Sequence, residues 1–179
     1  ARQYNPEEMV FYYFQGIAYY QKGEDDNALD ACRNGVAVIN GQSEPGIVSD
    51  FYSIMGDILH KKGMEKEAYV AYDSCLQWKP DNYGALNNYA YYLSVSDTLL
   101  EKAEQMSYRT IKAEPENATY LDTYAWIMFQ QERYSEAKIY IEQAVNHLDS
   151  TENNSTVIEH AGDIYFHTGN IDGAVAKWR

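Results

Sequence analysis

Three side chains near the C-terminus have the types and spacing that a metal site uses. His160, Asp163 and His167 stand three and four residues apart, so on a helix they would share one face. Imidazole and carboxylate groups are ligands for zinc. The two histidines, however, would lie two helical turns apart, about 10 Å, which is too far for both to hold one ion. We therefore interpret them as polar surface histidines and expect no metal and no other cofactor.

Motifs for catalysis are almost absent from the sequence. Ser135 and Lys138 reproduce one Ser-x-x-Lys nucleophile spacing, but Lys138 directly follows the alanine of an ordinary amphipathic helix, and nothing else of that motif is present. There is no Gly-rich phosphate loop, no Gly-x-Ser-x-Gly turn and no His-Glu-x-x-His. We therefore expect a protein that is not an enzyme.

The charge balance disfavours two classes of partner. Asp and Glu total 27 against 14 Lys and Arg, a net charge of −13, which repels phosphate backbones and anionic lipid headgroups. No apolar run approaches the roughly 20 residues that a membrane helix needs. We expect no nucleic-acid binding and no direct membrane insertion by this segment. Cys32 and Cys75 fit slots for small buried residues and are predicted to be inert core thiols.

The sequence contains a repeated pattern that predicts helices, and these helices would position any functional surface. The stretches KPDNYGALNNYAYYL and AEPENATYLDTYAWIMF are near-copies whose prolines, Pro80 and Pro115, stand 35 residues apart. The repeat occurs five times along the chain. One small residue marks each copy, and we call these the anchor residues: Gly16, Gly56, Ala90, Ala125 and Gly162. Large residues precede each anchor by four and follow it by three, which places them on one helical face. An alanine follows each anchor by twelve residues, or thirteen in the third copy: Ala28, Ala68, Ala103, Ala137 and Ala174.

Each copy therefore predicts two amphipathic helices joined by a short turn. Such a pair cannot bury its apolar face alone and must stack on its neighbours. Gly23, Gly63 and Gly169 lie in the turns and suit a left-handed helix stop. Pro80 and Pro115 are expected in the first turn of the following pair, where proline is tolerated.

The second copy carries the signature of a known repeat family, in the residues Tyr52, Met55, Gly56, Leu59, Ala68, Tyr72 and Pro80. On these residues the sequence resembles a tandem array of tetratricopeptide repeats, and the resemblance covers nearly the whole chain. It implies an all-α fold, a right-handed superhelical solenoid of helical hairpins. The third copy departs from the pattern at Ser107, where a large aromatic residue is usual.

The predicted domain organisation is a single repeat array over residues 1–179. Its units fall at about 9–42, 49–82, 83–117, 118–151 and 155–179, and residues 1–6 would be the tail of a preceding unit. We expect a portion of a longer array whose two ends leave apolar faces open, since solenoids normally carry polar capping units.

In tetratricopeptide arrays the first helix of each pair lines the inner, concave side of the superhelix. The resemblance therefore implies a groove lined by aromatic, amide and acidic residues, with almost no cations. We call this predicted lining the groove set: Tyr13, Ile17, Tyr20, Asp57, His60, Asn87, Tyr91, Asp122, Trp126, Phe129, Glu159, Asp163 and Phe166.

Two interpretations of the groove set remain open. Its large aromatic residues could pack between adjacent first helices or line a ligand groove: Tyr91, Trp126, Phe129 and Phe166. Its acids could form a solvated face or attract a partner that carries Lys or Arg: Asp57, Asp122, Glu159 and Asp163.

We predict a non-enzymatic protein-protein interaction scaffold that binds a peptide or protein segment with basic and apolar residues. The alternatives are a regulatory module that senses a ligand or signal peptide, and an intramolecular spacer in a larger protein. A carboxylate-clamp cochaperone is disfavoured because the clamp slots hold no Lys or Arg. The resemblance to bacterial arrays, some of them exported or lipid-anchored, leaves bacterial cytoplasm and envelope both open.

Overall fold

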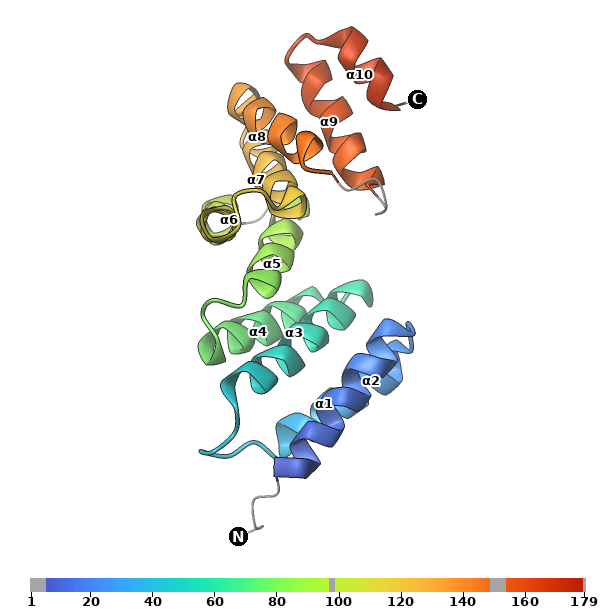
Figure 1. The fold of residues 1–179 in the computed structure, drawn as a ribbon, viewed down its shortest axis with the longest axis vertical. Helices are drawn as coiled ribbons and strands as arrows, with labels where there is room; N and C mark the ends of the chain where they lie inside the picture. The colour runs from blue at the N-terminus through green and yellow to red at the C-terminus, as the bar shows by residue number, and fades with distance from the viewer. Residues whose placement is uncertain (1–5, 97–98, 149–153, 179) are drawn as a thin grey trace. The chain divides into compact units, whose positions relative to one another are not determined.

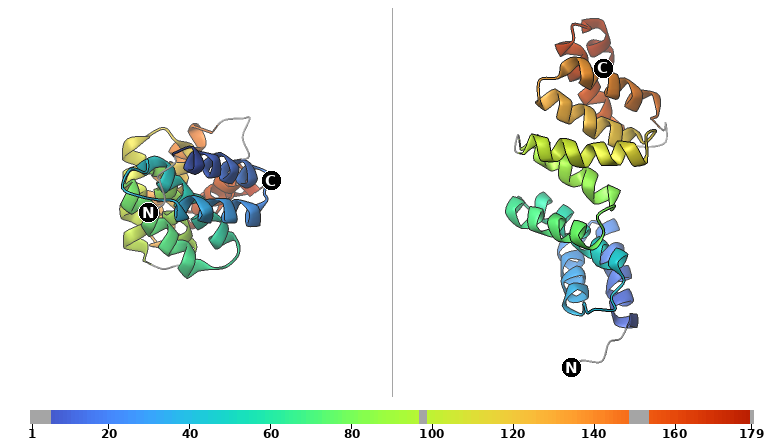
Figure 2. Two further views of the ribbon diagram at one scale, coloured as in Figure 1. Left: turned by 90° about the horizontal axis from the view of Figure 1, so that it is seen from below. Right: turned by 90° about the vertical axis from the view of Figure 1, so that its left-hand side faces the viewer.

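The chain folds into α-helices that pack in consecutive pairs. The structure, a computed structural model, describes residues 6–96, 99–148 and 154–178, and within these residues it contains no strand. Within each of the two units described below, Figures 1 and 2 show successive helices lying beside one another. The predicted all-α class is therefore confirmed. The chain divides into two compact units, residues 1–85 and 86–179, and each is described by itself.

The first unit consists of two helix pairs. Its helices are α1 (Pro6–Gln21), α2 (Asp25–Ala37), α3 (Pro45–Lys61) and α4 (Glu65–Trp78). Helix α1 packs on α2 and α3 on α4, while α2 and α1 both contact α3. Residues 1–5 of the predicted preceding tail lie outside the described part of the chain.

The second unit contains the remaining described helices. They are α5 (Tyr83–Val95), whose first turn holds the boundary between the units, α6 (Leu100–Ala113), α7 (Ala118–Gln130), α8 (Tyr134–Asn146), α9 (Ser155–His167) and α10 (Ile171–Trp178). Helix α7 packs on α8 and α9 on α10, and the pairs are joined because α8 and α7 both contact α9. Helix α6 packs on α7.

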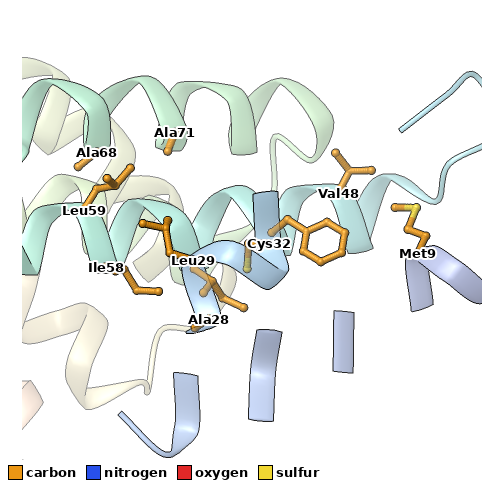
Figure 3. Packing of buried hydrophobic residues seen from close by; sticks show 11 residues of the cluster. Met9, Ala28, Leu29, Cys32, Val48, Ile58, Leu59, Ala68 and Ala71 are labelled. Carbon is orange, nitrogen blue, oxygen red and sulfur yellow. The ribbon is translucent and has the colours of Figure 1, made fainter. Parts of the chain in front are cut away.

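The core of the first unit lies between its helix pairs. Figure 3 shows Met9, Leu29, Cys32, Val48 and Ile58 converging there, all of them buried. Cys75 is also buried. Burial raises the pKa of the Cys32 thiol to about 12 and that of Cys75 to about 11. The prediction of core thiols is confirmed.

The turns inside the first, second, fourth and fifth pairs share one hydrogen-bond pattern. Gly23, Gly63 and Gly169 have φ angles of 72°, 73° and 79°, as predicted for left-handed helix stops. In the fourth pair the same place is taken by Glu132, with φ 60°. Its N–H donates to the carbonyl of Phe129, and the next N–H, that of Arg133, donates to Met128. The Gly23 turn repeats both bonds, to Tyr20 and Tyr19.

The predicted place of two prolines is wrong. Pro80 and Pro115 lie in the turns before α5 and α7, outside either helix. The asparagine two residues later begins the helix instead. The Asn117 side chain accepts a hydrogen bond from the Tyr120 N–H at 3.2 Å. The side-chain cap satisfies an N–H group that has no partner within the first turn of the helix. The proline therefore shapes the turn that leads to the capping residue and does not itself begin the helix.

Two anchor glycines leave room for a ring on the partner helix. A Cβ on Gly56 would lie 2.8 Å from the ring of Tyr72, and one on Gly162 would lie 2.2 Å from Trp178. Where the anchor is Ala125, the corresponding residue is Ile141. The same kind of fit joins two pairs in the first unit. A Cβ on Gly35 of α2 would lie 2.2 Å from the ring of the buried Phe51 of α3.

Candidate functional site

The groove set of the first unit is held by hydrogen bonds between helices. The Tyr13 hydroxyl donates to Asp50 at 3.0 Å, and the Tyr20 hydroxyl donates to Asp57 at 3.0 Å. Asp57 also accepts a hydrogen bond from Tyr72 of α4. Its carboxylate therefore joins α1, α3 and α4.

The other members in this unit are partly covered. Ile17 is half-buried and packs against the core. His60 is also half-buried, and the loss of solvent lowers the pKa of its imidazole. Burial raises the pKa of the Tyr13 hydroxyl, and its bond to Asp50 raises it further. Tyr20 is the most accessible aromatic residue of the groove set in this unit.

A buried polar pair joins α7 and α9 in the second unit. Asp122 is 5% exposed and His160 is 6% exposed. The Nδ1 atom of His160 lies 3.0 Å and 3.1 Å from the two carboxylate oxygens of Asp122. A carboxylate only accepts, so the imidazole N–H donates. The prediction of a surface histidine at 160 is wrong, and the interpretation of a solvated face does not hold for Asp122, because both side chains are buried against each other.

Trp126 stacks on this pair. Its ring is 3.9 Å from that of His160, with a 13° angle between planes, and 4.8 Å from Phe129, with a 15° angle. The Nε1 atom of Trp126 is buried and has no hydrogen-bond partner among the described residues. Trp126 therefore contributes packing between adjacent first helices, which is one of the two interpretations of the aromatic residues.

Tyr91 brings α5 to the same cluster. Its ring centroid is 6.1 Å from that of His160. Burial raises the pKa of the Tyr91 hydroxyl, and the carboxylates of Asp122 and Glu159 raise it further. Tyr91 is half-buried and Glu159 is exposed. Residues of three first helices therefore lie within electrostatic reach of one another.

The far end of α9 carries a second group of rings. His167 makes an edge contact with Phe129 at 4.9 Å and stacks on Tyr134 of α8 at 5.1 Å. Phe166 is half-exposed, at 50%. Asp163, one turn before His167, is partly buried, and its backbone carbonyl lies 2.9 Å from His167 Nδ1.

Asn87 does not behave like an accessible groove residue. It is buried, and its Oδ1 atom has no hydrogen-bond partner among the described residues. In the second unit Tyr91, Asp122 and Trp126 of the groove set thus lie against His160, whereas Asn87 is covered.

His160 is the residue that the sequence reasoning assigned wrongly. It stands two positions before its anchor, Gly162, and the same position holds Ile54 in α3 and Thr123 in α7. Both of those residues are buried. The register of the repeats was therefore the signal that His160 faces another helix. Among the described residues, no three potential metal ligands come together.

None of the described helices combines the length and apolarity needed to cross a membrane.

Comparisons with known proteins agree with this architecture. Residues 49–82 match the tetratricopeptide repeat model, the same range as the second predicted unit. A solved structure titled MamA 41-end from Desulfovibrio magneticus RS-1 superposes with a TM-score of 0.74 at 16% identity, covering 96% of this chain and 91% of that one. A structure titled as the functional characterisation of Pseudomonas aeruginosa pilF gives 0.75 at 20% identity, covering 96% and 74%. No curated protein matches significantly. At these identities the likeness establishes the fold.

Proposed function

We propose that this chain, a tetratricopeptide-repeat protein, is a non-enzymatic scaffold that binds a peptide or protein segment along the inner face of its first helices. Proteins with this fold generally act as interaction scaffolds rather than enzymes. The finer assignment, an aromatic and acidic binding surface that takes a basic and apolar segment, is our inference.

The observation that carries the proposal is the meeting of Tyr91, Trp126, His160 and Glu159 from three first helices. We divide this cluster into two roles. Asp122 and His160, both buried, and Trp126, which is partly buried, hold α7 against α9. The half-buried Tyr91 and the exposed residues Glu159 and Phe166 supply the contact surface.

Charge and ring surface together define the partner. Exposed carboxylates attract Lys and Arg side chains, and aromatic surface favours both apolar groups and cations. A net charge of −13 adds a long-range attraction for a basic segment. We therefore infer a segment that alternates basic and apolar residues.

Selection from a random dodecapeptide library on phage tests this proposal. Peptides enriched on the protein should carry Lys or Arg together with aliphatic or aromatic residues. For the strongest selected peptide, made synthetically, Phe166→Ala should weaken binding about tenfold or more, because a half-exposed ring loses its contact area. Glu159→Gln should flatten the salt dependence of association.

Ile139→Ala is the matched control, since Ile139 is an exposed apolar residue of α8 in the same unit, outside the groove set. It should leave the affinity unchanged. Enrichment of acidic peptides, or a loss of affinity in Ile139→Ala but not in Phe166→Ala, would overturn the proposal.

A further inference from the structure

A pocket opens between α3 and α4, the helices of the second pair. Its volume of about 460 Å³ falls within the range of about 300–1,000 Å³ that is typical of ligand sites. The exposed side chains of Lys66 and Glu67 border it. The rest of the lining is mainly apolar and comes from both helices: Tyr52, Met55, Leu59, Val70, Ala71 and Ser74. All of these residues lie outside the groove set.

The corresponding place in the fourth pair is filled by a tyrosine ring. Met55 stands one residue before its anchor and Ala71 stands fifteen after it. The fourth pair carries Tyr124 and Tyr140 at these two places. Their rings meet edge to face, with centroids 4.7 Å apart, and Tyr124 is buried. The pocket therefore lies where the second pair has a small alanine in place of a tyrosine.

The repeat register also identifies the side of the pair on which the pocket lies. In the fourth pair, Asp122 and Trp126 contact His160 of the following pair. Tyr124 points to the opposite neighbour, because its ring lies 6.2 Å from that of Tyr108 in the preceding pair. The pocket thus corresponds to the side that meets a preceding pair. In the second pair that neighbour, α2, packs on α3, yet all the lining residues belong to α3 and α4. The pocket is therefore open although its neighbour is in place.

We propose that this pocket binds the side chain of a tyrosine or phenylalanine presented by a partner protein, in the place that Tyr140 takes in the fourth pair. Two lining residues suit a ring. The thioether of Met55 makes favourable contacts with aromatic rings, and the ring of Tyr52 can form an aromatic pair.

The surroundings of the pocket favour a partner chain over a free aromatic molecule. Val70 is 66% exposed at the pocket and offers apolar surface to the residues on either side of the bound ring. A molecule with one ring would leave that surface uncovered. In the fourth pair, the ring that fills this place is likewise carried by a helix, α8.

An NMR titration of the full chain, followed at the methyl groups of Met55 and Leu59, tests this proposal. The probe is N-acetyl-tyrosinamide, which presents the tyrosine side chain between two peptide groups. It should shift both methyl resonances with a millimolar Kd. It should bind about threefold or more tighter than N-acetyl-leucinamide, because an aromatic contact adds to the buried area. It should also bind at least as tightly as p-cresol, which is the tyrosine side chain alone.

Three variants connect the binding to the pocket. Ala71→Tyr should weaken binding about tenfold or more, because it supplies the ring that the fourth pair already carries. Ser74→Phe, one turn away, should do the same, and circular dichroism checks that both variants fold. Tyr140→Ala should create a second site for the probe, visible at the methyl group of Met128. The matched control Ile139→Tyr adds a ring at an exposed residue of α8 and should bind like the wild type.

Five results would overturn the proposal. The probe could leave both methyl resonances unchanged, or the leucine compound could bind as tightly. A folded Ala71→Tyr protein could bind like the wild type. Tyr140→Ala could gain no second site, which would break the correspondence between the two pairs. Binding of p-cresol without binding of N-acetyl-tyrosinamide would mean that the pocket takes a free aromatic molecule and not a partner protein.

Discussion

In two helix pairs the small residue at the crossing leaves room for the ring that faces it. Glycine stands opposite the rings of Tyr72 and Trp178, and alanine is the anchor where the corresponding residue is Ile141. The fit of Phe51 against Gly35 extends this matching to the contact between two pairs. Because protein interiors are close-packed, one added methyl group at such a contact forces a shift.

Gly35→Ala should lower the free energy of unfolding by about 1–3 kcal/mol, as measured by urea titration. The new Cβ would lie 2.2 Å from the ring of a fully buried phenylalanine, which outweighs the higher helix propensity of alanine. Gly41→Ala is the control, because no atom lies within 4 Å of the Cβ it would add. Equal stability of the two variants would mean that Phe51 does not occupy this position in solution.

Trp126→Ala should lower the free energy of unfolding by about 2–4 kcal/mol, because it removes a ring stacked on both His160 and Phe129. Asp122→Ala should cost about 1–3 kcal/mol by leaving the buried imidazole without its acceptor. Asp122→Asn, which keeps an acceptor, should cost less. Urea unfolding measures all three. If the urea midpoint of Trp126→Ala equals that of the wild type, this ring does not stabilise the helix contact, and its interpretation as a ligand contact is favoured.

At the scale of helices, the turns inside the first, second, fourth and fifth pairs depend on one residue with a positive φ angle. Glycine adopts it without cost, whereas other residues lose roughly 1–2 kcal/mol there. Glu132 occupies this position in the fourth pair with the same hydrogen bonds as the glycine turns.

Glu132→Gly should therefore raise the free energy of unfolding by up to about 1 kcal/mol, and Gly63→Ala should lower it by about 1 kcal/mol. No atom lies within 4 Å of a Cβ at Gly63, so its cost is conformational. Thermal and urea unfolding of the two variants should shift in opposite directions. A destabilised Glu132→Gly protein would show that the Glu132 side chain makes a contact that matters more than its backbone strain.

The elements that could be predicted from the sequence are those whose interacting residues lie close together along the chain. The anchor residues and turn glycines act within one helix pair, so their spacing predicted the pairs and the left-handed stops. The helix starts were misplaced because proline and asparagine both mark a start, and the cap formed by Asn117 decides it. The contact between Asp122 and His160 joins residues 38 apart. The repeat register indicates that position 160 faces another helix, but it does not indicate that Asp122 is the partner.

At the scale of the whole molecule, each contact between repeats should stabilise mainly the repeats that make it. Stacked repeats contact only adjacent repeats, so the loss of one contact acts locally. Gly35→Ala should speed amide exchange in α1 to α4 and leave α7 to α10 unchanged, as measured by hydrogen exchange with mass spectrometry. A uniform increase across both units would instead indicate a single cooperative body.

The fit of Phe51 against Gly35 has a consequence for how the chain reaches its fold. Repeats that resemble one another compete for the same neighbours, and pairing out of order is a characteristic error of repeat proteins. Helices α4, α6 and α8 carry Cys75, Thr110 and Ala144 at the place of Gly35, and all three residues have a Cβ. A Cβ at Gly35 would lie 2.2 Å from the ring of Phe51, so we expect α3 to pack better against α2 than against these helices. The absence of a Cβ at Gly35 should therefore favour the correct pairing of α3 with α2 during folding over pairing with the similar second helices.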